Sequence, residues 1–255
     1  MKKVIHKSDL IKVIGKDNVF TRGLASVAMC ALGVNKINKL YAHSAELSDQ
    51  PFTEHMLDVY GITYDKNESE MNVIPKEGPF IIVSNHPFGA IEGIILYDAI
   101  ARVRPDFKVM ANFILSYIPN LKNVFIPVNP FTDKPEWGSS IGGIKEAMAH
   151  ISKGFGLGIF PAGEVSRYNG NKYPEDIDWS VTIAKLAKKA KVPVIPFYFD
   201  GTNSKTFYRL AKMHSMLGTA MLLRELYNKR NHHFTIKIGK PMVPSDLEVY
   251  DDYKK

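Results

Sequence analysis

Cysteines, long apolar runs and clusters of metal-binding residues are scarce in this 255-residue sequence, and each absence narrows what it can be. The single cysteine, Cys30, excludes an internal disulfide, and nothing supplies a cysteine-rich zinc site. The longest uncharged stretch near the N-terminus, residues 23–35, is shorter than the roughly twenty residues needed to cross a bilayer. The basic residues 1–7 are not followed by an apolar core, so we expect no signal peptide.

Acidic residues are outnumbered, with 26 Asp and Glu against 33 Lys and Arg, which gives a net charge of +7. A sequence pI near 9.2 suits an anionic membrane surface, an acidic carrier protein or nucleic acid equally well. No nucleic-acid motif is present, and the basic residues do not alternate with aromatic ones, so we expect no nucleic-acid partner. A hydrophobic content of 45% is enough for the core of one large domain.

Apolar runs of strand length alternate with helical segments from about residue 73 onwards, which predicts an α/β fold. We expect strands at residues 80–84, 107–110, 124–128, 156–160 and 193–199, and an edge strand within 234–241. We expect helices at residues 91–102, 112–119, 139–152, 179–190 and 215–230. The pattern predicts a mixed, mostly parallel sheet covered by helices, with a helical N-terminal element over residues 1–70 and the main domain over residues 71–255.

A stripe of apolar residues recurs at helical spacing near the N-terminus: Phe20, Leu24, Val27, Ala31 and Val34. Such a stripe more often packs against a protein core, and the pattern alone favours that interpretation. The alternative is an interfacial helix whose apolar face lies on a lipid surface.

The segment after the strand at 80–84 has the pattern of a general base presented on a loop. Asn85 and His86 enter a Pro/Gly turn, and Glu92 follows in the first turn of the next helix. A carboxylate that accepts the imidazole Nδ1 proton fixes the tautomer and leaves Nε2 to take a proton from a hydroxyl. No protein nucleophile is then required. The alternative is a histidine that only completes the turn.

Three further apolar runs end in similar turns, at residues 124–130, 158–167 and 192–198. The turn within 158–167 carries polar side chains that complement the His86 turn, namely Glu164, Ser166 and Arg167. Two strand ends with complementary chemistry predict one shared pocket.

In this order and spacing, the four blocks resemble the four motifs of the glycerolipid acyltransferase superfamily, typified by 1-acylglycerol-3-phosphate acyltransferase. Within it, the chain is most similar to the hemolysin-type branch. The first motif, Asn-His, four residues and then Asp, is matched by Asn85, His86 and Glu92. The third, Phe-Pro-Glu-Gly-Thr-Arg, is matched by Phe160, Pro161 and Gly163, with Arg167 displaced by two positions. The other two are matched by Phe125 and Ile126, and by Val192, Pro193 and Pro196.

The chain also departs from the family pattern at several positions. The spacing from His86 to Glu92 is one residue longer than usual, and Ala162 replaces the third-motif glutamate. Residues 127–129 stand where many members carry an arginine for the acceptor phosphate, and residues 110–112 replace a lysine pair. Since a guanidinium is the best bidentate phosphate ligand, these changes favour an acceptor other than lysophosphatidic acid.

The resemblance implies an acyltransferase domain over residues 71–255 that transfers a fatty acyl group from a thioester to a lysolipid hydroxyl, without a metal or cofactor. It implies His86 and Glu92 as the catalytic pair. The substrate-binding residues expected around them are Asn85, Asn112, Asn129, Gly163, Glu164, Ser166 and Arg167. A lyso-amino-acid lipid is the acceptor that we favour.

The implied partners are an acyl carrier protein or coenzyme A thioester, a lysolipid acceptor and a membrane surface. We expect a peripheral enzyme on the cytoplasmic face of the cell membrane, since the resembled family uses a helical N-terminal element for membrane association. The alternatives are a lysophosphatidic acid acyltransferase, a thioester or lipid hydrolase, a non-catalytic lipid-binding protein, and a hemolysin that acts without turnover.

Overall fold

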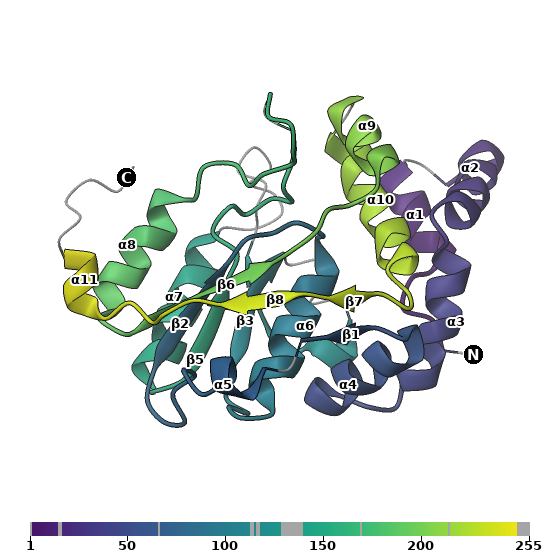
Figure 1. Ribbon diagram of the computed structural model, residues 1–255. Coiled ribbons are helices and arrows are strands. Elements are labelled where there is room, and N and C mark those ends of the chain that lie inside the picture. The colour runs from purple at the N-terminus through teal and green to yellow at the C-terminus, as the bar shows by residue number, and fades with distance from the viewer. Residues whose placement is uncertain are drawn as a thin grey trace.

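The computed structural model describes residues 2–14, 17–65, 67–112, 115, 118–128, 140–168, 170–213 and 215–248. These form an α/β fold around a six-stranded sheet with strand order β4-β3-β5-β2-β6-β8 (Figure 1). The strands of this sheet are β2 (Phe80–Ser84), β3 (Lys108–Asn112), β4 (Phe125–Val128), β5 (Gly156–Ile159), β6 (Val194–Phe199) and β8 (Ile236–Ile238). A separate parallel pair joins β1 (Thr63–Tyr64) to β7 (His233–Phe234).

The helices before β2 are α1 (Lys7–Ile14), α2 (Val19–Ala31), α3 (Val34–Ser44), α4 (Asp49–Tyr60) and α5 (Glu68–Met71). Those that follow are α6 (Ala90–Ala101), the 3-10 helix η2 (Pro119–Leu121), α7 (Ser140–Ser152), α8 (Val181–Ala190), α9 (Lys205–Met213), α10 (Ser215–Asn228) and α11 (Pro244–Glu248). In Figure 1, α1, α2, α3, α9 and α10 stand together at one end of the molecule, with α8 and α11 at the other.

Strands β2 to β6 run parallel, and only β8 pairs in the antiparallel direction, against β6. Every residue of the central strands β2 and β5 is buried, as expected where helices cover both faces of a parallel sheet. The predicted mixed, mostly parallel sheet is therefore confirmed. The boundaries of β2 to β6 and of α6, α7, α8 and α10 lie within two residues of the predicted ones, and β8 lies within the predicted range 234–241.

One face of the sheet packs against α4 and α6, where Phe80 and Ile82 share a hydrophobic core with Phe52 and Met56. The other face carries Ile81 and packs against α7 and α8. Helix α6 is buried from Ile91 to Ala101 without a polar face, because it lies between the sheet and α4. Helix α4 thus contributes to the same core as the sheet, and the predicted domain boundary at residue 70 stays a prediction.

The start of the helix predicted for residues 112–119 is wrong, and residues 113, 114, 116 and 117 lie outside the described residues. Asn112 is the last residue of β3 and pairs with Val128, so ladder hydrogen bonds to β4 extend the strand two residues further than predicted. Pro119 then begins η2 instead of lying in an α-helix, because proline has no N–H with which to continue one. Helix α9 was not predicted, whereas α10 agrees with the helix expected at 215–230.

The apolar stripe near the N-terminus does not pack into the core. Phe20 and Val27 on α2 are 78% and 64% exposed, and the buried side of this helix is formed by Thr21, Ala25 and Met29. Of the stripe only Val34 is buried, and it belongs to α3, beyond a turn at Gly33. Among the described residues, no helix combines the length and the apolar character needed to cross a membrane.

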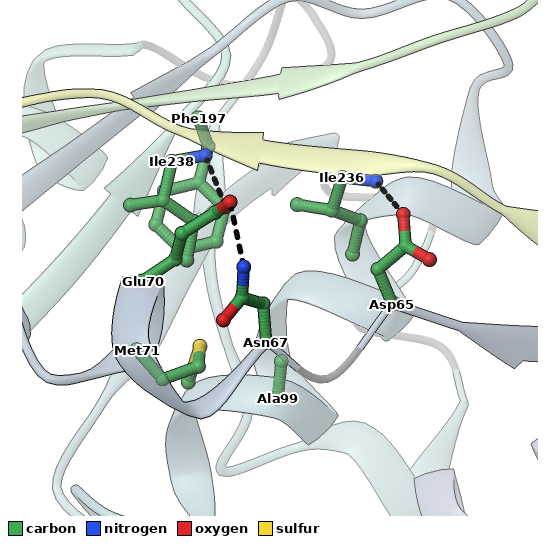
Figure 2. A pocket seen from close by; sticks show the side chains of 8 residues that line it. All are labelled: Asp65, Asn67, Glu70, Met71, Ala99, Phe197, Ile236 and Ile238. Carbon is green, nitrogen blue, oxygen red and sulfur yellow. Dashed lines mark hydrogen bonds between the residues drawn. The ribbon is translucent and has the colours of Figure 1, made fainter.

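Two carboxylates cover the free edge of β8 (Figure 2). Asp65 accepts the Ile236 N–H at 3.1 Å, and Glu70 accepts the Ile238 N–H at 3.2 Å. Exposed strand edges can pair with other chains, and these contacts satisfy the donors that would do so. The cavity beneath them, lined also by Met71, has a volume of about 10 Å³, room for about one water molecule.

Candidate active site

The first and third sequence blocks lie side by side at the carboxyl edge of the parallel sheet. Strand β2 ends at Ser84 and leads directly to His86, while its neighbour β5 ends at Ile159 and leads to Phe160. The register aligns Val83 with Ile159, so the first and third blocks leave the sheet side by side. Ligand sites of open α/β sheets lie at this edge, which is where the sequence predicts the pocket.

Asn85 joins the end of β2 to the end of β6. Its side-chain Nδ2 donates to the Phe199 carbonyl at 2.9 Å, and its Oδ1 accepts the Phe199 N–H at 2.8 Å. The amide thus replaces a pair of ladder hydrogen bonds where the strands diverge. The substrate contact predicted for Asn85 stays a prediction beside this structural role.

His86 and Glu92 lie together. The His86 Nδ1 is 2.9 Å from the Glu92 Oε1, and their side chains are 17% and 0% exposed. The ring N–H is not aimed at that oxygen well enough to count as a hydrogen bond, so Nδ1 has no hydrogen-bond partner among the described residues. The Glu92 carboxylate therefore lies in close contact with the edge of the imidazole without a hydrogen bond to Nδ1.

Glu92 is fixed by the start of α6. Its Oε1 accepts the backbone N–H groups of Phe88 and Gly89 at 2.9 and 2.8 Å, as the third residue of a helix does in a capping box. Gly89 has φ 109°, and an added Cβ would lie 2.8 Å from Leu222, so only glycine fits this turn. The helix start thus brings Glu92 to His86 across the longer spacing.

The second oxygen of Glu92 has no partner among the described residues, although it is buried. An ionised, buried and half-satisfied carboxylate is costly unless a cation lies nearby. The Lys229 ammonium is a cation whose charge interacts with Glu92.

The third block contacts His86 in two ways. The Phe160 ring lies 4.6 Å from the imidazole, measured between ring centroids. The Ser166 N–H donates to the His86 carbonyl at 2.8 Å, and the Ser166 hydroxyl donates to Asp176 at 2.6 Å. Ser166 is buried, and the head-group contact predicted for it stays a prediction beside these observed bonds.

Asp176 is a site residue that the sequence pattern did not reveal. Its Oδ1 accepts the backbone N–H of His86 at 3.1 Å, and its Oδ2 accepts the Trp179 indole N–H at 3.0 Å. It lies in an irregular segment, where neither periodicity nor a motif draws attention to it. The spacing Asp-x-x-Trp is the only signal that could have done so.

Glu164 and Arg167 pair with each other at the surface. Their side chains form a salt bridge and are 46% and 49% exposed. Gly163, which precedes them, has φ 69° and allows the turn. Any anion that binds Arg167 must compete with Glu164 for the guanidinium.

One predicted residue lies on another strand, and one lies outside the described residues. Asn112 ends β3 at the same sheet edge and is partly buried. Asn129 lies outside the described residues. Among the described residues, no group of three or more histidines, cysteines and acidic residues could hold a metal ion.

The layer behind the His86 loop is polar and packed. Asn203 Nδ2 donates to the Phe88 carbonyl at 3.1 Å, and the Lys229 ammonium donates to Thr202 and lies 4.8 Å from the centre of the Phe88 ring. Burial lowers the pKa of Lys229. An added Cβ on Gly201 would lie 2.7 Å from the same ring. The His86 loop therefore contacts this polar layer as well as the third block.

Comparisons with known proteins found a family profile and related sequences. The profile of the family described as Acyltransferase matches residues 19–254. Lyso-glycine lipid O-acyltransferases of Bacteroides thetaiotaomicron and Phocaeicola vulgatus are 31% and 29% identical over 180 residues. Each alignment covers 66% of this chain, which spans 62% and 61% of those relatives, less than two thirds of their length.

A solved structure, the 1-acyl-sn-glycerophosphate acyltransferase of Thermotoga maritima, superposes with a TM-score of 0.44 at 18% sequence identity. That match covers 84% of this chain and 78% of the other. Because the family profile spans nearly the whole sequence, this chain belongs to the acyltransferase family.

Proposed function

We propose that this chain transfers a fatty acyl group from a thioester to the hydroxyl of a lysolipid, in membrane lipid biosynthesis. The observation that carries the proposal is the His86–Glu92 pair, buried at the carboxyl edge of the sheet with the third block beside it. The two lyso-glycine lipid O-acyltransferases support a lysolipid acceptor.

The reaction is a single displacement. His86 Nε2 takes the proton of the acceptor hydroxyl while the oxygen attacks the thioester carbon, the C–S bond breaks, and the thiolate leaves with that proton. Glu92 holds the ring and stabilises its cationic form, and backbone N–H groups receive the developing oxyanion. General base catalysis contributes about 10² to 10⁴ in rate, and an oxyanion donor about 10² to 10³, so the pair needs no metal.

We further propose a lyso-amino-acid lipid as the acceptor. An amino acid linked through its nitrogen presents a carboxylate, and Arg167 is the cation of the third block that would bind it. Glu164 would be displaced from Arg167 as the head group enters. The residues that would line the rest of the substrate site are Asn85, Asn112, Asn129, Gly163 and Ser166.

For the acyl donor we propose an acyl carrier protein or coenzyme A thioester. Helix α8 carries Lys185, Lys188 and Lys189, and a basic helix suits an acidic carrier protein or the phosphates of coenzyme A equally well. Competition between the two donors in one reaction would separate them.

We also propose that the protein is peripheral to the cytoplasmic face of the cell membrane. The exposed stripe of α2 offers an apolar face to the acyl region, and a net charge of +7 favours anionic lipid. A lipid acceptor that stays in the membrane makes such docking useful.

Product analysis tests the proposal. The purified protein is incubated with acyl carrier protein or coenzyme A thioesters and with a panel of lysolipids that includes lyso-glycine lipid and lysophosphatidic acid. The expected product is the acylated amino-acid lipid. Acylation of lysophosphatidic acid alone, free fatty acid alone, or binding without turnover would replace the proposal with one of its alternatives.

A further inference from the structure

The peptide of His86 is held from both sides by residues of the third block and its following loop. Its N–H donates to the Asp176 carboxylate at 3.1 Å, and its carbonyl accepts the Ser166 N–H at 2.8 Å. The Ser166 hydroxyl donates to the same Asp176 oxygen at 2.6 Å. These three bonds close a ring that joins two strand ends.

Asp176 reaches this position because of a local bridge. Arg167 and Glu175 exchange backbone hydrogen bonds at 2.8 and 3.0 Å, so these two residues lie side by side. The next residue after Glu175 is therefore delivered beside Ser166. A residue 90 positions from His86 in sequence thus contacts its backbone.

We propose that Asp176 is the positioning residue of the catalytic histidine, an inference that rests on the proposed function. It fixes the backbone of His86, while Glu92 and the Phe160 ring contact the imidazole. A charged acceptor suits this task, because hydrogen bonds to a carboxylate are about twice as strong as those to a neutral acceptor.

Loss of the Asp176 contact is expected to disturb the alignment of the His86 ring and not the binding of the substrates. The Nδ1 of His86 lies at ion-pair distance from Glu92 without a well-aimed hydrogen bond, so a small shift of the backbone changes the ring's orientation. A misplacement of about 1 Å in an active site can cost about a hundredfold in rate. Loss of Asp176 should therefore lower kcat and leave the Michaelis constants of donor and acceptor nearly unchanged.

The kinetic test compares Asp176→Ala with Asp65→Ala. Asp65 is the control, because like Asp176 it accepts a backbone N–H and side-chain hydrogen bonding, but at the β8 edge. We expect Asp176→Ala to lower kcat by about ten- to a hundredfold with both Michaelis constants within about twofold of wild type. Asp65→Ala should keep the wild-type kcat, even where it lowers the melting temperature as much.

A second measurement does not depend on enzymatic activity. Nitrogen-15 NMR of the histidine rings reports the tautomer and environment of His86, whose signals are assigned by their loss in His86→Ala. We expect them to shift in Asp176→Ala and to stay in place in Asp65→Ala. If Asp176→Ala does not fold, Asp176→Asn replaces it, since the amide keeps the shape and removes the charge, and a smaller change of the same kind is expected.

The outcomes separate the two proposals. A wild-type protein that makes no acyl ester with any donor and acceptor would refute the proposed function, whereas the NMR comparison would still decide the positioning role. A folded Asp176 variant with wild-type kcat and unshifted His86 signals would overturn the positioning role in an active enzyme. A fall in kcat matched by Asp65→Ala at equal loss of stability would overturn it as well.

Discussion

Two histidine–carboxylate pairs of nearly equal length lie in the part of the chain that the structure describes, and their surroundings differ. His86 Nδ1 lies 2.9 Å from Glu92 Oε1, and His233 Nε2 lies 2.8 Å from Asp65 Oδ1. The first pair is nearly buried, whereas the side chains of His233 and Asp65 are 55% and 37% exposed. Distance alone therefore does not identify a catalytic pair.

In the second pair, the remaining ring nitrogen and the remaining carboxylate oxygen both have hydrogen-bond partners. The other nitrogen of His233 lies 2.9 Å from the Thr63 hydroxyl, and the other oxygen of Asp65 accepts the Ile236 N–H. In the first pair, one buried oxygen of Glu92 is left without a partner in the part of the chain that the structure describes. This unmatched oxygen beside a nearly buried histidine distinguishes the first pair from the second.

The largest effect is expected from removing the base. His86→Ala should lower turnover by at least about a hundredfold, the usual range for a general base, and should leave the fold intact. Steady-state rates with one thioester donor and the preferred lysolipid measure the loss, and circular dichroism checks the fold. A wild-type rate in a folded variant would refute the role of His86.

A smaller loss, on the order of tenfold, is expected from Glu92→Gln. The amide oxygen can still accept the N–H groups of Phe88 and Gly89, but it no longer stabilises the imidazolium with a negative charge. Asp65→Asn makes the same chemical change in the other pair and should leave kcat unchanged. Equal losses in both variants would remove the distinction between the pairs.

Arg167→Ala sharpens the comparison between the buried pair and the exposed Glu164–Arg167 pair. If Arg167 binds the acceptor's anionic group, its loss should raise the acceptor's Michaelis constant by about tenfold and leave the donor's unchanged. Glu164→Gln removes the competing partner and should lower the acceptor's Michaelis constant. Equal effects of Arg167→Ala on both substrates would contradict this role.

The exposed stripe of α2 is expected to affect membrane binding without affecting chemistry. Replacing Phe20 and Val27 together with serine should weaken co-sedimentation with anionic vesicles, because both apolar side chains face solvent. Activity on a short-chain soluble acceptor should be retained. Val243→Ser, which also alters an exposed apolar residue, serves as the control, and an equal loss of vesicle binding there would argue against α2.

The smallest effect concerns stability in acid. The hydrogen bond from His233 holds the pKa of Asp65 below its usual range, so this carboxyl stabilises the fold above its unfolded pKa of about 3.9. That contribution is lost as the pH falls through the lower folded pKa. The difference between the urea midpoints at neutral and at acid pH should therefore be smaller in Asp65→Asn than in wild type. The change should be slight, since the Asp65 side chain is 37% exposed. An equal difference in both proteins would show that Asp65 does not contribute to this pH dependence.

Much of the fold could be predicted because the parallel strands are continuous apolar runs. Residues 80–84 and 156–159 are buried on both faces, and such runs are recognisable without knowledge of their neighbours. The His86–Glu92 contact could be predicted because both residues lie on one short segment between a strand and a helix. Local sequence contains that information.

The remainder depends on contacts that no local pattern encodes. Asp176 reaches His86 through an irregular loop, and α2 turns its apolar stripe outward because Thr21, Ala25 and Met29 face the other helices instead. Asn112 does not begin the helix predicted at 112–119, because it pairs with Val128 of β4. In each of these cases, contacts between residues far apart in the sequence determined the structure, and local propensity did not.

Single-turnover acyl transfer by wild type, His86→Ala and His233→Ala, with the acylated lipid quantified by mass spectrometry, compares the two pairs in one experiment. We expect His233→Ala to form product at the wild-type rate and His86→Ala to be slower by at least about a hundredfold. Equal rates for the two folded variants would contradict the assignment of the buried pair as the catalytic one.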